Sequence, residues 1–415
     1  MFESFVSKRF LAHGKNQKGN TLLAIATVSI TLSVLVMIMS VSILRGFQQE
    51  ITNKVVGFGS HIVVQSYSEH NLYDAAPILA SRPEADRLKQ LPEVKSIQYF
   101  AEKGGMIKTS ENIHGIIFKG IGTDFDTSFF HTNLDEGRMP IVSDILHNSD
   151  STPQPSTEVL VSRTIARKLG LAVGDKIRTY FWQGGTYRAR VFVLTGIYNS
   201  DISEFDEHYV IGDIAQIQKI NGWGRDSVAG YEVLLNDATT PKAIAESQSS
   251  VNEAIGYDLT SQTIVERNPT LFSWLQLLNS NIWLILGVMS LVCVVAITSA
   301  FLIMIFQNTS TIGILKTLGA NNGSVRKIFI IKSSHIILRG IVWGNVIALL
   351  LCIVQKSFHV VRLDSASYSM SFVPIELNGM TFALISIATF AVCLLSLLVP
   401  ANHIAHISPA QTIKQ

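Results

Sequence analysis

Charged residues and cysteines are scarce in this chain. Of its 415 residues, 15% are Asp, Glu, Lys or Arg, 47% are hydrophobic and three are Cys. This composition is too apolar for an ordinary soluble enzyme and too charged for a chain that lies entirely within a membrane. We therefore expect membrane segments joined to a folded polar domain.

The sequence patterns of catalytic and metal sites are also missing. GKNQKG (14–19) lacks the G-x-x-x-x-G-K-[ST] pattern that binds phosphates. The 11 His residues show neither HExxH nor close ligand spacing, and no nucleophile–His–acid set is evident. The sequence predicts no catalytic residue, no metal site and no cofactor on this chain.

The three cysteines, Cys293, Cys352 and Cys393, all fall within apolar runs. The polar part of the chain has none, so its fold does not depend on disulfides even in an oxidising compartment. In apolar helices these small side chains are expected to serve packing.

Four apolar runs reach the length of about 20 residues that a membrane-spanning helix needs. Three contain no charged residue, and the third contains only Arg339, near its start, where a long side chain can reach the interface. The first run is too long for a signal peptide and has no small-residue cleavage site, so we interpret it as a retained anchor. The runs are Leu22–Leu44, Ile282–Phe306, Ile336–Val354 and Met380–Pro400.

Lys and Arg in the short segments predict the orientation. Residues 1–20 hold four basic residues against one Glu, and the connector 308–333 holds four with no acid. Both termini and this connector are therefore predicted to be cytoplasmic. Residues 44–280 hold 21 Lys and Arg against 28 Asp and Glu, a net charge of −7, which argues against nucleic-acid binding.

These patterns divide the chain into an ordered series of segments. Phe2, Phe5, Val6 and Phe10 share one face of a short interfacial helix, although a frayed basic tail is the alternative. The predicted segments are an interfacial helix at 1–20, spans at 21–44, 281–307, 334–355 and 380–400, an exported domain at 45–280, a cytoplasmic connector at 308–333, an exported loop at 356–379 and a cytoplasmic tail at 401–415.

The exported domain reads as mixed α/β. Strand–helix–strand patterns occur at 60–65, 82–91 and 94–100, and again at 230–237, 241–255 and 257–264. Two such units can pair into one sheet with helices on a face. Between them we place a distal insertion near 125–225, which includes a predicted surface loop at 147–158 and a hairpin at 175–198. The predicted fold class is an α-helical membrane protein with four transmembrane helices and a large mixed α/β domain inserted between helices 1 and 2.

The connector contains STIGILKTLGANNGSVRKIF (310–329), which predicts a short amphipathic helix. Thr309 or Ser310 can cap it, Gly319 can end it, and Ser324 can begin the next helix. Such a helix can insert apolar side chains into a groove of a partner protein, or it can rest on lipid headgroups. The predicted docking residues are Ile312, Ile314, Leu315, Lys316, Leu318 and Gly319.

The outer ends of the first two spans carry apolar residues beyond the expected membrane boundary. These helices can leave the bilayer as stalks, and in a dimer the stalks can enclose an apolar cavity for acyl chains. The alternative is ordinary packing of the stalks, with Trp at the interface. The residues are Val41, Leu44, Phe47, Ile51, Phe272, Trp274, Leu277, Leu278 and Trp283.

The order of these segments resembles the permease family that includes FtsX, MacB and the lipoprotein-releasing LolC/LolE proteins. Several stretches are similar to the lipoprotein-releasing branch, and together they cover nearly the whole chain. They are RGFQQEITNKVVGFGSHIVV (45–64), SRTIARKLGLAVGDKI (162–177), VLTGIYNSDISEFDEHYV (193–210), TIGILKTLGANNGSVRKIF (311–329) and HISPAQTIK (406–414).

The resemblance implies a non-enzymatic permease subunit in the inner membrane of a Gram-negative bacterium. It implies a LolD-like ATPase subunit that binds ATP and Mg²⁺, a second permease copy or paralogue, membrane lipid and a lipoprotein substrate. ATP-driven mechanotransmission would then extract the lipoprotein from the outer leaflet. The alternatives are a permease of the same fold for efflux or for control of a periplasmic hydrolase, and a non-transporting receptor or scaffold.

One departure from the family concerns the hairpin after the Gly-Asp motif. In one member of the lipoprotein-releasing pair it extends into a hook that docks a periplasmic LolA-like chaperone. Here it turns tightly at WQGGTY (182–187), which puts chaperone capture by this chain in doubt. The candidate partner-contact residues at this tip are Trp182, Gly184, Gly185 and Tyr187.

Overall fold

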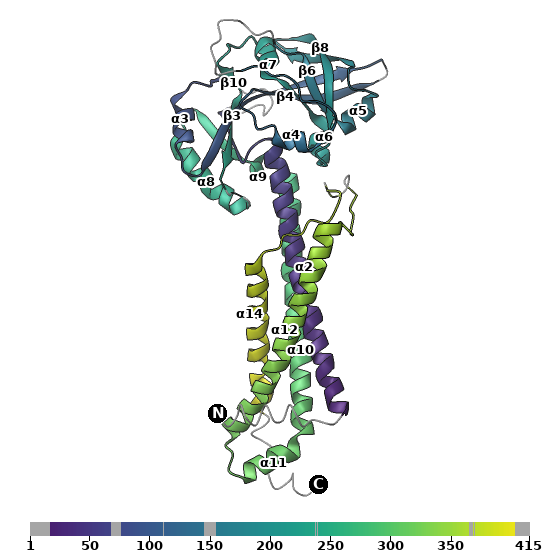
Figure 1. Ribbon diagram of the computed structural model, residues 1–415. Helices are drawn as coiled ribbons and strands as arrows, with labels where there is room; N and C mark the ends of the chain where they lie inside the picture. Colours follow the sequence, from purple (N-terminus) through teal and green to yellow (C-terminus); the bar gives the residue numbers. More distant parts are fainter. Residues whose placement is uncertain are drawn as a thin grey trace. The chain divides into compact units, whose positions relative to one another are not determined.

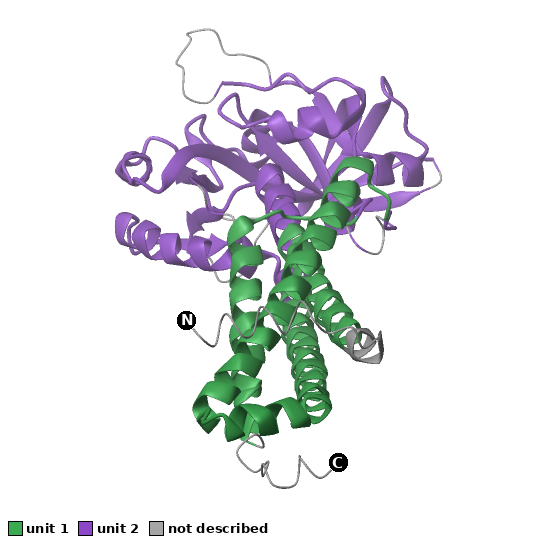
Figure 2. Ribbon diagram, turned by 60° about the horizontal axis from the view of Figure 1, so that its bottom comes forward, with its two compact units in different colours: residues 1–47, 274–361, 373–415 green, residues 48–273, 362–372 purple. Residues whose placement is uncertain are grey.

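The computed structural model describes residues 17–67, 76–110, 112–144, 155–236, 238, 240–364, 368 and 370–402. The chain forms two compact units, shown in different colours in Figure 2. Unit 1 comprises residues 1–47, 274–361 and 373–415, and unit 2 comprises 48–273 and 362–372. Three predictions fall wholly or largely outside the described residues: the interfacial helix at 1–20, the surface loop at 147–158 and the tail at 401–415.

Unit 1 is helical. Four helices among the described residues are long and apolar enough to cross a membrane, in agreement with the four apolar runs. They are α2 (Gln17–Phe58), α10 (Pro269–Gln307), α12 (Asn322–Phe358) and α14 (Gly379–Ser396), the last followed by α15 (Leu398–Ala401). The short α11 (Thr309–Thr317) connects α10 to α12.

Two of these helices are longer than the apolar runs that predicted them. Helix α2 has 42 residues and α10 has 39, and each continues without a break between the residues of unit 1 and those of unit 2. At 1.5 Å per residue, α2 is roughly 60 Å long, about twice the hydrocarbon thickness of a bilayer. The expectation that these two helices extend beyond a membrane is consistent with this length.

Glycines allow α12 to pack closely against α2. A Cβ on Gly340 would lie 2.7 Å from Ile30, and one on Gly344 would lie 2.8 Å from Val34. The Thr31 hydroxyl donates to the Gly340 carbonyl at 3.2 Å. Small residues four apart, with a hydroxyl bonded across the contact, are typical of helix pairs in membranes.

Within the described residues, unit 2 is built on a ten-stranded sheet with the order β12-β1-β11-β3-β4-β9-β6-β8-β5, with β7 paired to β3 and β8. Figure 1 labels several of these elements. The strands are β1 (Ile62–Ser66), β3 (Val94–Lys108), β4 (Ile113–Ile121), β5 (Leu134–Gly137), β6 (Glu158–Ser162), β7 (Lys176–Gln183), β8 (Thr186–Tyr198), β9 (Tyr209–Asp213), β11 (Gly230–Leu235) and β12 (Leu259–Thr263), and a separate pair is formed by β2 (Ile78–Leu79) and β10 (Ser227–Val228).

The helices of unit 2 are short. The two predicted strand–helix–strand units are present as β1, α3, β3 and as β11, α8, β12, and α3 and α8 lie side by side (Figure 1). The helices are α3 (Pro83–Lys89), α4 (Ser128–Thr132), α5 (Arg163–Leu169), α6 (Ser203–His208), α7 (Ile214–Asn221), α8 (Pro241–Ala254) and α9 (Ile264–Arg267).

The long strand β3 joins the two halves of this sheet. Its residues 94–100 pair with β11, and its residues 100–108 pair with β4. Because β4 then pairs with β9 in parallel, the distal half begins at β4, before the predicted limit of 125. The expected insertion is therefore continuous with the proximal part through main-chain hydrogen bonds.

Candidate functional site

Helix α11 follows α10 after Asn308, which occupies the N-cap position without a side-chain capping bond. The predicted cap by Thr309 or Ser310 is wrong. Thr309 is the first helical residue, and its hydroxyl donates to the Phe306 carbonyl at 2.5 Å, within the last turn of α10. The hydroxyl therefore bonds to a carbonyl at the end of α10 and does not cap α11.

The end of α11 is fixed by a Schellman-type motif. The Gly319 N–H donates to the Lys316 carbonyl at 3.1 Å, and the Ala320 N–H donates to the Leu315 carbonyl at 3.0 Å. Gly319 has φ +91°, a conformation that favours glycine, so its predicted role as the helix stop is confirmed. Helix α12 begins at Asn322, two residues before the predicted start at Ser324.

The apolar residues of α11 divide between two faces. Ile312 is fully buried, and Leu315 packs against the same core cluster of unit 1. Ile314 and Leu318 are 52% and 79% exposed. At 3.6 residues per turn Ile314 and Leu318 lie about 40° apart, so they form one open apolar patch. Lys316 is half-buried and Gly319 is exposed.

The predicted cavity residues are likewise not equivalent in the single chain. Leu44, Phe47, Ile51 and Phe272 are buried, which matches the packing alternative. The Phe47 and Trp274 rings meet edge to face, with centroids 6.0 Å apart. Leu277 and Trp283 are 65% and 70% exposed, and the half-buried members are Val41, Trp274 and Leu278.

The hairpin between β7 and β8 closes as tightly as predicted. Gly184 and Gly185 have φ +58° and +81°, as a two-residue type I′ turn requires. Trp182 and Tyr187 are cross-strand partners with ring centroids 4.9 Å apart, and both are more than half exposed. The tip is an exposed aromatic pair.

Unit 2 contains a group of buried charges that no local sequence pattern predicted. Lys119 lies 2.5 Å from Glu232, and Arg267 lies 3.0 Å from Glu102. The one visible signal was Lys119 itself, a lysine within the apolar strand GIIFKGI (115–121). Its acidic partner is distant in sequence, so no local pattern reveals the pair.

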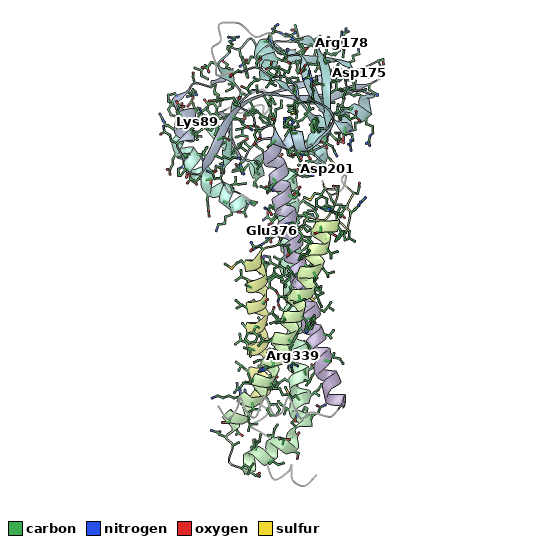
Figure 3. All side chains as sticks on the ribbon, in the orientation of Figure 1. Lys89, Asp175, Arg178, Asp201, Arg339 and Glu376 are labelled. Atoms are coloured by element: carbon green, nitrogen blue, oxygen red, sulfur yellow. The ribbon has the colours of Figure 1, made fainter. Side chains whose placement is uncertain are left out.

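The described residues contain no group of three or more His, Cys, Asp or Glu side chains able to hold a metal ion. Arg339, the charged residue of the third apolar run, lies on α12 with an exposed side chain (Figure 3). That the guanidinium reaches toward the interface stays a prediction from its position near the start of the third apolar run.

Two family models match this chain. The model for the MacB-like periplasmic core domain matches residues 23–249, more than half of the chain, and the model for the FtsX-like permease C-terminal region matches residues 283–409. Together they cover most of α2, of unit 2 and of α10, and the whole of α12 and α14.

Curated relatives match over most of their lengths. The lipoprotein-releasing system transmembrane protein LolE of Haemophilus influenzae is 22% identical, over 99% of this chain and 98% of the relative. The corresponding LolC protein of Xylella fastidiosa is 22% identical, over 93% of this chain and 92% of the relative. Among solved structures, the periplasmic region of MacB from Actinobacillus actinomycetemcomitans is 12% identical, with a TM-score of 0.32, over 50% of this chain and 91% of that structure.

Proposed function

This chain belongs to the family of permeases that combine a MacB-like periplasmic core domain with an FtsX-like C-terminal region, and from this membership we propose that it is the permease subunit of an ABC transporter that releases lipoproteins from the outer leaflet of the inner membrane. The observation that carries the proposal is the alignment with LolE and LolC relatives over 98% and 92% of their own lengths. Unit 1, unit 2 and the connector are all included in that match.

The proposed arrangement has four transmembrane helices, with unit 2 in the periplasm and both termini in the cytoplasm. The charges of the connector support this orientation, because Lys316, Arg326, Lys327 and Lys332 occur there without an acidic residue. In this arrangement α11 faces the cytoplasm, where nucleotide is available.

We propose that α11 docks a LolD-like ATPase subunit through Ile314 and Leu318. ATP and Mg²⁺ are bound by that subunit, and this chain contributes no cofactor site. The opposite face of α11 holds Ile312 and Leu315 against the core of the helical bundle. A push on the exposed face would therefore be passed to α10 and α12 through packed side chains.

A second permease copy or a paralogue completes the proposed transporter. Leu277 and Trp283, exposed on α10, are the predicted cavity residues best placed to contact that second chain or an acyl chain. Burial of acyl methylenes is worth about 0.8 kcal/mol each, which suits an apolar cavity for the lipid anchor. The exposed aromatic pair Trp182 and Tyr187 is the proposed contact for a partner protein, and the tight turn between them argues against capture of a LolA-like chaperone by this chain.

Release is tested by reconstituting the chain with its ATPase and second permease in vesicles loaded with a triacylated lipoprotein. We expect ATP-dependent transfer of the lipoprotein to a soluble acceptor. A catalytically inactive ATPase is the control. Steady ATP hydrolysis with no transfer would reject lipoprotein release and favour the efflux, regulatory or scaffold alternatives.

A further inference from the structure

Two buried ion pairs lie in unit 2, one beside the C-terminal end of α2 and the other just before the start of α10. Helix α2 ends at Phe58, and α9, which immediately precedes α10, ends at Arg267. The Lys119 and Glu232 side chains are only 2% and 3% exposed, and those of Arg267 and Glu102 are 13% and 5% exposed. The first pair adjoins the end of α2, and the second includes the residue that leads into α10.

The first pair is bonded directly to the backbone of α2. The Lys119 ammonium donates to the Phe58 carbonyl at 3.0 Å, and the Gln98 amide donates to the Gly59 carbonyl at 2.9 Å. Gln98 also donates to Glu232 at 3.0 Å. The last carbonyls of a helix have no partner within the helix and carry partial negative charge, so a buried ammonium there is well placed.

Strand register places these groups in one row. Glu232 is opposite Gln98 across β11 and β3, and Glu102 is opposite Lys119 across β3 and β4. Residues 98 and 102 of β3 lie on the same face because side chains alternate along a strand. The Phe100 ring, between them on that face, is 5.9 Å from both the Lys119 ammonium and the Arg267 guanidinium.

Side-chain packing fixes the same helix end a second time. The Phe58 ring stacks on Phe205 at 4.5 Å and meets Tyr209 edge to face at 4.9 Å. We call Phe58, Gln98, Glu102, Lys119, Glu232 and Arg267 the helix-end joint. All joint residues except Gln98 line a cavity of about 420 Å³, and the four charged side chains among them are paired with one another.

Buried ion pairs are weak evidence for stability, and in some proteins they specify one packing arrangement. Replacing a buried pair by apolar residues of similar volume is often neutral for stability, whereas the charges impose one bonded arrangement. Here that arrangement ties the end of α2 and the start of α10 to three adjacent strands. A displacement of α2 relative to the sheet would break the hydrogen bond from Lys119 to the Phe58 carbonyl. A displacement of the segment that begins α10 would break the buried Arg267–Glu102 ion pair.

We propose that the helix-end joint imposes movement of α2 and α10 on the sheet of unit 2, and that Lys119 and Arg267 are positioning residues for release. This inference rests on the proposed function, because it assigns the joint a place in ATP-driven release. Lys119 acts through the Phe58 carbonyl, and Arg267 acts through the segment that begins α10.

The test removes the charges in pairs, so that no buried ion is left alone. The variants are Lys119→Met with Glu232→Gln, Arg267→Met with Glu102→Gln, and the four changes combined. The control is Arg138→Met with Glu158→Gln, which removes a more exposed ion pair between the residue after β5 and the first residue of β6. In the complete reconstituted transporter we measure lipoprotein released per ATP hydrolysed.

We expect the combined variant to keep ATP hydrolysis within twofold of wild type and to lose at least tenfold in release per ATP. A merely destabilised protein lowers hydrolysis and release together, so the ratio separates a positioning role from a structural one. The control should keep the wild-type ratio. An unchanged ratio in the combined variant would overturn the proposal.

If the wild-type transporter releases no lipoprotein, the proposed function is rejected, but the role of the joint is still untested. A second measurement then tests the joint by itself. Amide hydrogen exchange is compared with and without ATP in the whole complex. In wild type and the control, ATP should change exchange in α11 and in strands β3, β4 and β11. In the combined variant only α11 should respond. The proposal would be refuted if the strands of the combined variant still responded to ATP. It would also be refuted if the strands of the wild-type protein did not respond.

Discussion

Leu315 and Leu318 of α11 are the same residue type three positions apart, yet they face different surroundings. Leu315 packs against the bundle, and Leu318 is 79% exposed. A substitution at Leu315 therefore perturbs the fold of unit 1 as well as any contact with a partner. A substitution at the exposed Leu318 tests docking without disturbing the packing of unit 1.

Leu318→Asp is expected to reduce copurification of the ATPase with this chain at least tenfold, because a charge would have to be desolvated in an apolar groove. Pull-down of the intact complex from membranes measures this. Asn322→Asp, at an exposed position in the first turn of α12, is the matched control and should retain the ATPase. Stoichiometric binding by Leu318→Asp would show that docking does not use this patch.

Asp206 on α6 is a buried acid outside the helical bundle. Its Oδ1 accepts bonds from the Ser200 hydroxyl at 2.8 Å and the Ser200 N–H at 3.1 Å. Burial raises the pKa of Asp206 from 3.8 to about 6, although the bonds from Ser200 act in the opposite direction. Between these pH values the folded chain binds more protons at this site than the unfolded chain does, so the contribution of Asp206 to stability falls as pH rises from about 4 to 6.

Asp206→Asn should therefore stabilise the protein at pH 7, by on the order of 2 kcal/mol, because Asn keeps the acceptor for Ser200 and carries no charge to desolvate. Thermal unfolding in detergent between pH 4 and 7 measures the effect. The variant should gain most at pH 7 and little at pH 4. Equal melting temperatures at pH 7 would show that the buried carboxylate is not destabilising.

At the scale of elements, the contact of α2 with α12 depends on the absence of side chains at Gly340 and Gly344. Both hypothetical Cβ atoms meet atoms of α2 at less than 3.0 Å. Since neighbouring helix backbones cannot yield by that amount locally, a larger residue would force the helices apart.

Gly344→Leu should destabilise unit 1 by about 1–3 kcal/mol, the usual effect of overpacking a close contact. Gly287→Leu on α10 is the control, since no atom lies within 4 Å of a Cβ built there. Thermal unfolding of the two variants in the same detergent compares them. A melting temperature as low for Gly287→Leu as for Gly344→Leu would argue that the loss is not specific to the α2–α12 contact.

At the scale of the whole molecule, the chain passes between its two units four times, twice within a helix and twice at the ends of residues 362–372. The two helical passages are α2 and α10, and each of these helices contains residues of both units.

The proposed orientation is tested by labelling single cysteines from each side of the membrane. Leu318→Cys should react only with reagent on the cytoplasmic side, and Tyr257→Cys, at a fully exposed position of unit 2, only with reagent on the periplasmic side. The three native cysteines are buried and should react slowly. Labelling of Leu318→Cys from the periplasm would remove the basis for ATPase docking.

The amino-acid sequence by itself determined the four apolar helices, the two strand–helix–strand units, the stop at Gly319 and the tight turn at Gly184 and Gly185. Each of these depends on near neighbours: the length of an apolar run, the alternation of side chains, or a backbone conformation that glycine adopts readily. Interactions within a few residues are sufficient to specify them.

Only the tertiary structure decided which face of α11 is open, which stalk residues are buried and how the charges of unit 2 pair. Apolar residues occur on both faces of α11, so its sequence pattern does not choose between them. Lys119 and Glu232 are 113 positions apart, and the pairing of strands β11, β3 and β4 brings them together. Burial and ion pairing depend on surfaces supplied by distant segments, which a local pattern does not contain.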